Sequence, residues 1–298
     1  MHVFVTGATG LIGRAACAAL LERGHRVTAL SRSAAGGRLP AGVRAVQGDP
    51  TSPGPWQEEL SRADACLNLA GEPIDAARWT DAFKHRIRES RVRATANVAE
   101  VIRSRGPTVL VSASAVGYYG ARGDERLDES SAPGSDFLSR TSVAWEEAAL
   151  PARARARVAW LRTGVVLAAG GGALPQMVRP FRLFAGGPLG DGKFFQPWIH
   201  LADEVGLALL ALEDGRVEGP VNATAPEPAR NRELARAIGR VLGRPSLLPT
   251  PAFAVRLAVG EMATVVLSSQ RAVPAKALAL GYRFRFPDLE GALRDLLR

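Results

Sequence analysis

Near its amino terminus the chain reads Val3-Phe4-Val5-Thr6-Gly7-Ala8-Thr9-Gly10-Leu11-Ile12-Gly13, an apolar strand followed by three glycines and an apolar segment with helical spacing. Glycine lets the backbone turn tightly and approach a ligand, and the free N–H groups at the start of a helix favour an anion. A glycine-rich turn without a ligand is the alternative, but the order strand, turn, helix favours a dinucleotide site. The predicted phosphate-binding residues are Gly7, Thr9, Gly10, Leu11, Ile12 and Gly13.

The composition is typical of an ordinary globular protein. At 298 residues the chain can bury one large core or two unequal ones. Its 47% hydrophobic and 22% charged residues argue against disorder, and no apolar run approaches the ~20 residues that a membrane helix needs. Because the first strand begins at once, with no basic signal region, we expect a cytoplasmic protein without a membrane partner. Cys17 and Cys66 lie in apolar segments, so we expect buried thiols and neither a disulfide nor a metal site.

A net charge of +9 makes nucleic-acid binding a hypothesis to weigh. Arginine clusters occur at residues 84–93 and 153–157, while lysine occurs only at Lys84, Lys193 and Lys276. Neither cluster has the interleaved aromatic side chains of a base-stacking surface, and acidic residues lie near both. We therefore expect solvated faces, or an arginine that binds a cofactor phosphate, and no nucleic-acid partner.

Strand-like and helix-like segments alternate through most of the chain, which predicts an α/β fold with a doubly wound parallel sheet. Loops after the carboxyl ends of such strands share one ligand-binding edge. We expect residues 1–165 to form a Rossmann domain to which 197–223 return, and residues 166–298 to form a smaller, mainly helical substrate-binding portion. The predicted strands are 3–6, 26–30, 43–47, 65–69, 109–112, 158–161 and 221–223, and the later helices are 174–183, 231–242 and 289–297.

The residues after the second strand predict NADP (NADPH) in preference to NAD. An acid usually follows this strand and accepts hydrogen bonds from the ribose 2′-hydroxyl. Here the chain has Ser31 and Arg32, and a guanidinium suits a 2′-phosphate, although an exposed loop arginine is the alternative. Asp49 would accept from the adenine amino group, or form an ordinary turn. Leu69-Ala70-Gly71 would let the chain run close to the nicotinamide ribose.

Several sequence blocks occur together in the order typical of one family. They are Thr6 to Gly13, Asn68-Leu69-Ala70-Gly71-Glu72-Pro73-Ile74, Ser112-Ala113-Ser114-Ala115-Val116-Gly117-Tyr118-Tyr119-Gly120, Leu161-Arg162-Thr163-Gly164, Trp198-Ile199-His200 and Asn222-Ala223-Thr224-Ala225-Pro226. With them the chain resembles an atypical extended short-chain dehydrogenase/reductase, of the "epimerase family protein" subgroup described as NAD(P)-dependent epimerase/dehydratase-like. Its tail resembles the C-terminal domain of unknown function in that subgroup. The resemblance covers nearly the whole chain and names no substrate.

The resemblance implies a proton-transfer site that this chain lacks in its usual form. In the superfamily a serine after the fifth strand acts with Tyr-x-x-x-Lys on the next helix, whose lysine lowers the tyrosine pKa. The tyrosine and lysine positions here are Leu138 and Ser142. Ser114 matches the serine, and Ser112 lies on the same side of the strand, beside the cofactor. Tyr118 is the predicted replacement acid or base, and a packed loop ring is the alternative.

The resemblance also places further residues near the site. Glu72 and Arg91 would lie beside the cofactor, Arg91 where family members have a helix asparagine. Glu72 would also bind a polar substrate at the mouth. His200 titrates in a useful range, and hydrogen bonding within the fold is its alternative. Phe194 and Trp198 would line the substrate pocket, or would pack the interface between the two parts of the chain. The predicted substrate-binding residues are Arg78, Phe194, Trp198 and His200.

Two functions are compatible with these features. The first is an NADP-dependent oxidoreductase or epimerase of an unidentified small molecule, with a non-standard proton relay through Ser114 and Tyr118. The alternative is a non-catalytic, regulatory NADP(H)-sensing protein, which the missing tyrosine and lysine would explain directly. We expect a monomer or a homodimer.

Overall fold

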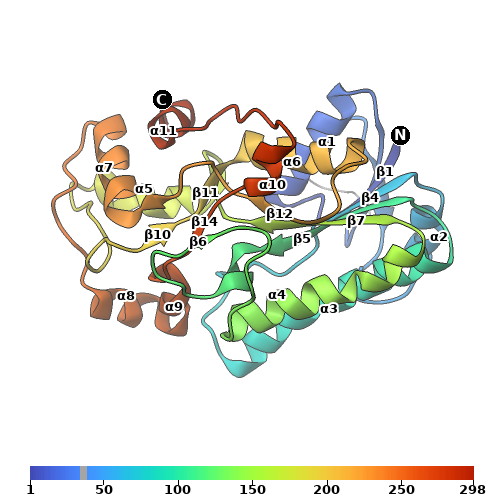
Figure 1. The fold of residues 1–298 in the computed structure, drawn as a ribbon, viewed down its shortest axis with the longest axis horizontal. Coiled ribbons are helices and arrows are strands. Elements are labelled where there is room, and N and C mark those ends of the chain that lie inside the picture. The colour runs from blue at the N-terminus through green and yellow to red at the C-terminus, as the bar shows by residue number, and fades with distance from the viewer. Residues whose placement is uncertain (34–38) are drawn as a thin grey trace.

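The computed structural model describes residues 1–33 and 39–298. Its centre is a sheet of seven strands in the order β12-β7-β5-β4-β1-β2-β3, and all neighbouring strands are parallel (Figure 1). The predicted doubly wound α/β fold is thus confirmed. The strand order reverses between β1 and β4, which is where such folds bind their ligands. The strands are β1 (His2–Thr6), β2 (Arg26–Ser31), β3 (Arg44–Gln47), β4 (Ala65–Asn68), β5 (Val109–Ala115), β7 (Arg157–Thr163) and β12 (Gly219–Ala223).

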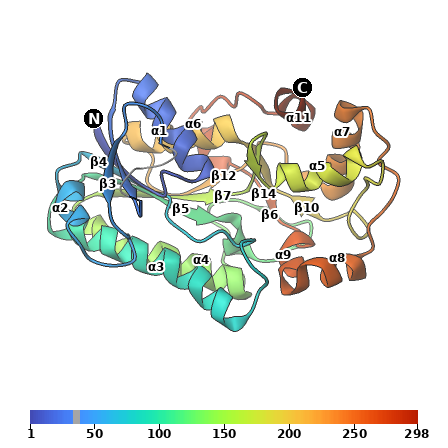
Figure 2. The ribbon, with the colours of Figure 1, turned by 180° about the vertical axis from the view of Figure 1, so that it is seen from behind.

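Helices cover both faces of the sheet, which explains why every residue of β1 and β4 is buried. One face carries α1 (Leu11–Glu22) and α6 (Leu201–Glu213), whose Leu20 and Leu209 belong to one apolar cluster. The other face carries α2 (Trp56–Ser61), α3 (Asp81–Ser104) and α4 (Phe137–Ala148) (Figures 1 and 2). The loops at the carboxyl edge of the strands are therefore the natural place for a site.

The second half of the chain adds a body beyond that edge, with α5, α7, α8 and α9 at the end of the molecule away from α1 (Figure 1). Three small sheets, β11-β8-β9, β10-β13 and β14-β6, support it. No helix in the described part of the chain is long and apolar enough to span a bilayer. The remaining elements are η1 (Val116–Tyr119), β6 (Arg126–Leu127), η2 (Leu150–Ala154), β8 (Val165–Ala168), β9 (Gly171–Gly172), α5 (Leu174–Arg182), β10 (Phe195–Gln196), β11 (Trp198–His200), β13 (Ala229–Arg230), α7 (Asn231–Leu242), α8 (Ala252–Val259), η3 (Gly260–Met262), α9 (Ala263–Val266), β14 (Arg271–Ala272), α10 (Ala275–Ala279) and α11 (Leu289–Leu297).

The tail after residue 249 is mainly helical, and its buried side chains join cores built by earlier segments. Leu293 of α11 lies in the apolar cluster of Ile238 of α7. Ala277 of α10 lies in the cluster of Leu207 of α6. Strand β14 pairs in parallel with β6. The tail therefore connects the central sheet and its helices to the outer helices.

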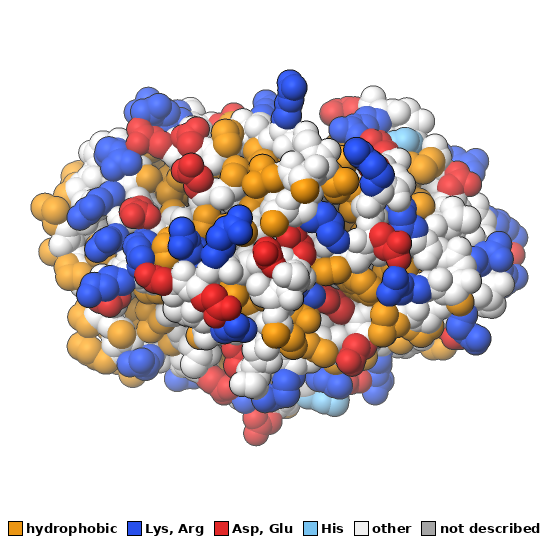
Figure 3. Space-filling model, viewed as in Figure 1, with side chains coloured by type: hydrophobic (Ala, Val, Ile, Leu, Met, Phe, Trp, Pro, Cys, Tyr) orange, Lys and Arg blue, Asp and Glu red, His pale blue; other side chains and the backbone are white. Residues whose placement is uncertain are grey.

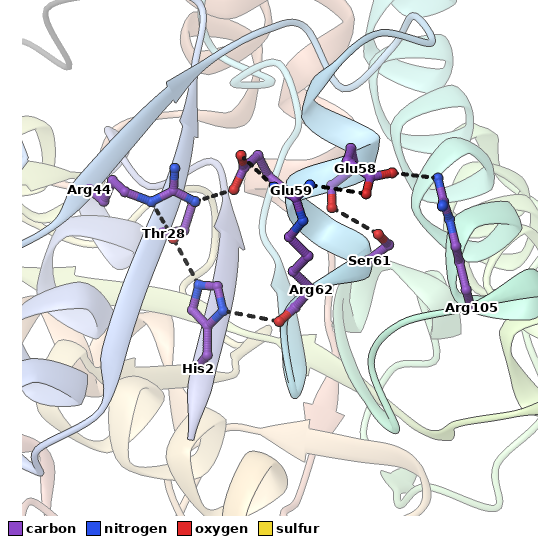
Figure 4. A network of polar contacts seen from close by, with 8 residues as sticks. All are labelled: His2, Thr28, Arg44, Glu58, Glu59, Ser61, Arg62 and Arg105. Atoms are coloured by element: carbon purple, nitrogen blue, oxygen red, sulfur yellow. Dashed lines mark hydrogen bonds and ion pairs between the residues drawn. The ribbon is translucent and has the colours of Figure 1, made fainter.

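Polar side chains close the opposite edge of the sheet, where the strands begin (Figure 4). His2 Nε2 lies 2.8 Å from Thr28 Oγ1, and His2 Nδ1 lies 3.3 Å from the carbonyl oxygen of Arg62. Arg44 donates to Thr28 Oγ1 and pairs with Glu59. Burial lowers the pKa of His2, so its ring is neutral at pH 7. The side chains of the protein itself thus occupy this part of the amino edge, whereas the loops at the carboxyl edge are where such folds bind their ligands.

Acidic side chains accompany the two arginine clusters. Arg93 lies 2.7 Å from Glu89, and Arg153 lies 2.7 Å from Glu218. On the face drawn in Figure 3, basic and acidic side chains are interspersed. Exposed pairs of this kind add little stability, but they dilute the local positive charge. Each cluster is therefore a mixed, solvated surface.

Candidate functional site

The turn between β1 and α1 accommodates only glycine at two positions. Gly7 has a φ of 66°, and a Cβ there would lie 2.5 Å from the carbonyl oxygen of Leu69. A Cβ on Gly13 would lie 2.2 Å from the carbonyl oxygen of Gly7. Gly10 precedes α1 without a side-chain cap, and no acidic residue occupies the first helical turn. The N–H groups of that turn therefore form an anion site that fits a dinucleotide pyrophosphate.

A buried polar network fixes the strand ends beneath this turn. Thr6 donates to Asn68 Oδ1 at 2.7 Å, and Asn68 Nδ2 donates to Thr95 Oγ1 at 2.8 Å and to Ser112 Oγ at 3.1 Å. The backbone N–H groups of residues 69 and 70 both lie 3.2 Å from Thr6 Oγ1. Ser112 is fully buried, so it ties β4 to β5 under the predicted cofactor position.

The residues predicted to select the cofactor lie at the ends of β2 and β3. Ser31 is buried, and its hydroxyl accepts from the backbone N–H of Ser33 at 3.2 Å. Arg32 follows it and is exposed. Asp49 Oδ1 accepts from the backbone N–H of Thr51 at 2.8 Å and from its hydroxyl at 2.7 Å. That Asp49 oxygen therefore serves the ordinary turn that was the alternative to adenine binding.

A cleft of about 910 Å³ runs from the glycine turn, along the carboxyl ends of the strands, to the outer helices. Its middle is lined by Ser114 of β5, Ser142 of α4 and Thr163 of β7. Its outer end is lined by α5, α7, α8 and α9. Of the predicted phosphate-binding residues, Gly7, Gly10, Leu11, Ile12 and Gly13 line the inner end, and Thr9 is exposed on the turn.

Ser114 contacts a buried ion pair at the end of β5. Its hydroxyl donates to Oε1 of Glu146 on α4 at 2.7 Å. Arg162 of β7 donates to the two Glu146 oxygens at 2.8 and 2.9 Å, and the two side chains are only 4% and 12% exposed. Burial alone would lower the pKa of Arg162, but the hydrogen bonds and charge of Glu146 outweigh it and raise that pKa above its usual value. Because a carboxylate only accepts, the Ser114 proton points at Glu146 and the oxygen lone pairs are left for a ligand.

Tyr118 packs against this ion pair from η1. The guanidinium carbon of Arg162 lies 3.5 Å from the centre of the Tyr118 ring. The neighbouring Tyr119 accepts from Arg162 Nη1 at 3.0 Å and donates to Asn222 Oδ1 at 2.7 Å. Burial raises the pKa of Tyr119 to about 12. Tyr118 is not among the described residues that line the cleft, so the geometry favours the packed-ring alternative over the predicted acid-base role.

The positions of the missing tyrosine and lysine do line the cleft. Leu138 and Ser142 lie one turn apart on α4, and neither side chain titrates near neutral pH. Ser142 is buried. The charged group that α4 brings closest to the site is therefore Glu146, one turn further along the helix.

Arg91 of α3 shapes the loop after β4. It lines the cleft, and its Nη1 donates to the carbonyl oxygens of Glu72 and Ile87 at 2.9 Å each. Its guanidinium stacks over the ring of Trp145, and burial lowers its pKa to about 10. The carboxylate of Glu72 lies 2.9 Å from Arg86. Arg91 thus holds the loop in place, while the Glu72 side chain is paired on the surface of α3.

Four predicted substrate-binding residues are not among the described residues that line the cleft. Trp198 is 1% exposed, and its indole donates to the carbonyl oxygen of Glu227 at 3.1 Å. His200 accepts from the backbone N–H of Ala202 at 3.0 Å, which caps α6, and stacks on Phe286. Burial lowers the pKa of His200. Both residues thus have structural partners, and the other two outside the lining are Arg78 and Phe194.

Two parts of the site escape prediction from the sequence. Glu146 and Arg162 lie on separate elements, although an arginine inside the apolar run Val158-Ala159-Trp160-Leu161-Arg162 signals a buried acidic partner. The sequence of α8 and α9, which form the outer wall of the cleft, contains no motif that indicates a binding site. Only packing shows that these helices reach the cleft.

A second buried carboxyl lies behind the cleft wall. Glu204 Oε1 accepts from Thr163 Oγ1 at 2.8 Å, and Glu204 Oε2 has no partner among the described residues. Burial raises the pKa of Glu204 to about 8. Glu204 is therefore protonated at neutral pH and adds no charge to the cleft.

Two family models match the chain. Residues 3–223 match the NAD dependent epimerase/dehydratase family, and residues 250–296 match a domain of unknown function, DUF1731. The chloroplastic homolog of epimerase family protein SDR39U1 from Arabidopsis thaliana is 41% identical, over all of this chain and 87% of the relative. Epimerase family protein YfhF from Bacillus subtilis is 38% identical, over all of this chain and 98% of the relative.

Solved structures match along the whole chain as well. Human epimerase family protein SDR39U1 (isoform 2), crystallised with NADPH, superposes with a TM-score of 0.89 and 36% identity over 99% of both chains. A nucleoside-diphosphate sugar epimerase from Corynebacterium glutamicum has a TM-score of 0.80 and 37% identity, over 99% of this chain and 58% of that chain.

Substituting Gly13→Ala should abolish nucleotide binding, because the new Cβ would overlap the backbone of Gly7. We expect destabilisation of about 1–3 kcal/mol from overpacking, and no heat of binding when NADPH is titrated in a calorimeter. Gly215→Ala is the matched control, since nothing lies within 4 Å of its Cβ position. Unchanged NADPH affinity in the Gly13 variant would contradict the assignment of this turn.

Substituting Glu204→Gln should flatten the pH dependence of stability. When folding raises the pKa of a carboxyl group, that group contributes fully to the stability of the folded state at any pH below its unfolded-state pKa. The contribution is lost as the pH rises through its folded-state pKa. The loss in the wild type therefore falls between about pH 4.5 and pH 8, at about 1.4 kcal/mol for each unit that separates the two pKa values. Urea unfolding at several pH values measures it, with exposed Glu22→Gln as control. Equal slopes in wild type and Glu204→Gln would show that Glu204 does not titrate in this range.

Proposed function

The chain belongs to the NAD dependent epimerase/dehydratase family, and from that premise we propose that it binds NADP(H) and acts as an oxidoreductase or epimerase with a non-standard proton relay. The observation that supports the activity is the hydrogen-bonded series Ser114, Glu146 and Arg162, which ends in the same cleft as the glycine turn. The human relative crystallised with NADPH supports the choice of cofactor.

The residues of this chain fit the parts of NADP(H) in turn. The glycine turn would hold the pyrophosphate, Ser31 and Arg32 the 2′-phosphate, and Asp49 the adenine. Residues 69–71 would pass beside the nicotinamide ribose. When bound, the cofactor supplies or accepts a hydride. The nucleotide-binding part is proposed to comprise residues 1–165 with 197–223, a return supported by β12 in the central sheet, and residues 166–298 to bind substrate.

Ser114 is the residue placed to exchange a proton with substrate. As a bound alcohol is oxidised, its hydroxyl proton passes to Ser114 Oγ, and the Ser114 proton passes to Glu146 Oε1 along the 2.7 Å hydrogen bond. The alcohol then becomes a carbonyl, and reduction returns the proton by the same path. Arg162 is a positioning residue, because its two hydrogen bonds fix the Glu146 carboxylate. Tyr118 contributes indirectly, because its ring packs on the guanidinium group of Arg162.

A non-catalytic NADP(H)-sensing role is the second candidate function. It is favoured by the cleft surface of α4, where Leu138 and Ser142 replace the usual acid and its activating lysine. The two candidates differ in turnover, because a sensor would bind NADPH and leave every alcohol or carbonyl compound unchanged. A cytoplasmic location, and a monomer or homodimer, remain proposals. The Arabidopsis relative is itself named chloroplastic.

Substituting Arg32→Ala should weaken NADPH binding and leave NADH binding unchanged. Charge-assisted hydrogen bonds contribute about 1.5–3 kcal/mol, so we expect about a 10- to 100-fold rise in the Kd for NADPH. Fluorescence titration with both cofactors measures it. Arg155→Ala, an exposed arginine before β7 at the opposite edge of the sheet, serves as control. Tighter NADH than NADPH binding in the wild type would refute the preference.

Substituting Ser114→Ala should lower turnover by about 10²- to 10⁴-fold, the range for loss of a general acid or base. The ion pair behind it stays intact, so we expect wild-type melting temperature and NADPH affinity. Glu146→Gln should lower turnover too, but it leaves Arg162 buried without its charged partner and should also destabilise the fold. Glu147→Gln removes the same charge from the exposed neighbour and is the control. Loss of nicotinamide absorbance with a set of alcohols and carbonyl compounds measures turnover, and activity that survives Ser114→Ala would refute the relay.

A further inference from the structure

The outer end of the cleft is walled by apolar side chains from four helices. We call this end the outer compartment; its principal lining residues are Phe181 of α5, Leu234 and Ile238 of α7, Val255 and Val259 of α8, and Val266 of α9. Among all described residues that line the cleft, the charged ones are Asp75 and Arg91. Neither belongs to the four helices. The described residues of these four helices that line the outer compartment are therefore all uncharged.

The two charged lining residues are already engaged near the loop after β4. Arg91 Nη1 donates to two backbone carbonyl oxygens at 2.9 Å, and its guanidinium stacks on Trp145. Asp75 accepts from Gln176 at 3.2 Å and is exposed. Arg91 therefore positions the loop, and the other charged residue among the described cleft lining, Asp75, is negative.

The polar side chains at the inner border of the outer compartment satisfy one another. Asn231 Nδ2 donates to Gln196 Oε1 at 2.9 Å, and Asn231 Oδ1 accepts from the backbone N–H of Leu189 at 2.7 Å. Both side chains are buried. These amide groups are therefore bonded within the protein and are not available to an anionic ligand.

This lining discriminates strongly between substrate classes. A nucleoside-diphosphate sugar would bring a pyrophosphate into a space where the described lining offers no free cation, and an unpaired buried charge is very unfavourable. A hydrocarbon chain, in contrast, gains about fourfold in affinity for each buried methylene.

The surroundings of the outer compartment are apolar as well. Val255 and Val259 of α8 face the cleft, whereas Phe253 and Leu257 of the same helix are 71% and 78% exposed. Figure 3 shows hydrophobic side chains gathered over α8 at the lower left of the molecule. An apolar molecule that approaches the outer compartment thus meets apolar surface before it is buried.

We propose that the outer compartment binds the hydrocarbon part of an uncharged, lipid-like alcohol or ketone, and that it rejects nucleoside-diphosphate sugars. The placement of the reactive carbon rests on the proposed function, since that end would lie at Ser114. The hydrocarbon end would lie between α7 and α8. The substrate class thus follows from the chemistry of the lining.

Displacement of a neutral fluorescent probe tests the proposal on the full chain with NADPH present. N-phenyl-1-naphthylamine should bind, and 2-alkanones from six to twelve carbons should displace it with affinities that rise by about fourfold per methylene until the compartment is filled. UDP-glucose should not compete. A flat response to chain length, or displacement by UDP-glucose at lower concentration than 2-decanone, would overturn the proposal.

A pair of variants on α8 locates the binding site. Ala254→Glu puts a charge on a partly exposed position of the cleft lining and should weaken 2-decanone binding at least tenfold. Arg256→Glu makes a larger change of charge on the same helix, outside the described lining, and should have no effect. Melting temperature and NADPH affinity report whether both variants fold. Equal weakening in both would mean that the effect comes from surface charge and not from the outer compartment.

Turnover of the same compounds separates this proposal from the proposed function. If 2-alkanones bind with the expected chain-length dependence but are not reduced, the outer compartment is assigned correctly and the reaction is wrong. If UDP-glucose is turned over and this turnover requires Ser114, while 2-alkanones do not bind, the proposed reaction is supported and the proposed ligand of the outer compartment is wrong.

Discussion

A buried ion pair between Glu146 and Arg162 is the interaction on which the site depends. Removing either partner would leave an uncompensated charge inside the protein, at a cost of about 3–5 kcal/mol. The pair joins α4 to β7, and through Ser114 it reaches β5. Arg162 also donates to Tyr119, whose hydroxyl donates to Asn222 of β12, and the Asn222 amide donates to a backbone carbonyl of the tail at 2.9 Å. A single network therefore connects the cleft, the sheet edge and the C-terminal segment.

The position of the cation distinguishes this site from the usual arrangement of its superfamily. There a lysine on the helix activates a tyrosine, whereas here Leu138 and Ser142 occupy those places and line the cleft. The cation is Arg162, which lies behind the acid. The Ser114 hydroxyl is thus polarised from within the protein, and the described residues of α4 that line the cleft are uncharged. In such low-dielectric surroundings a hydrogen bond to a carboxylate is stronger than it would be in water.

Local patterns in the sequence predict most of the fold. The helices over 231–242 and 289–297 occur at the predicted bounds, and the resemblance to the epimerase family and its C-terminal domain is confirmed. Side-chain roles are harder, because aromatic and titratable residues suit a core and a site equally well. Trp198 and His200 lie among family-like residues yet serve packing and a helix cap. The partnership of Glu146 with Arg162 joins separate elements, so only the folded chain reveals it.

The division of the chain into two matched regions explains why family membership leaves the substrate open. The region over 3–223 contains the glycine turn and Ser114 with its ion pair, which are the residues of the proposed nucleotide site and proton path. The region over 250–296 contributes α8 and α9 to the outer wall of the cleft. The proposed proton path thus lies in the first region, whereas helices from both regions, together with α7, line the outer compartment, and β14 pairs with β6 to connect the two regions. We therefore expect a change in α8 or α9 to alter what enters the cleft and to leave the glycine turn and Ser114 in place.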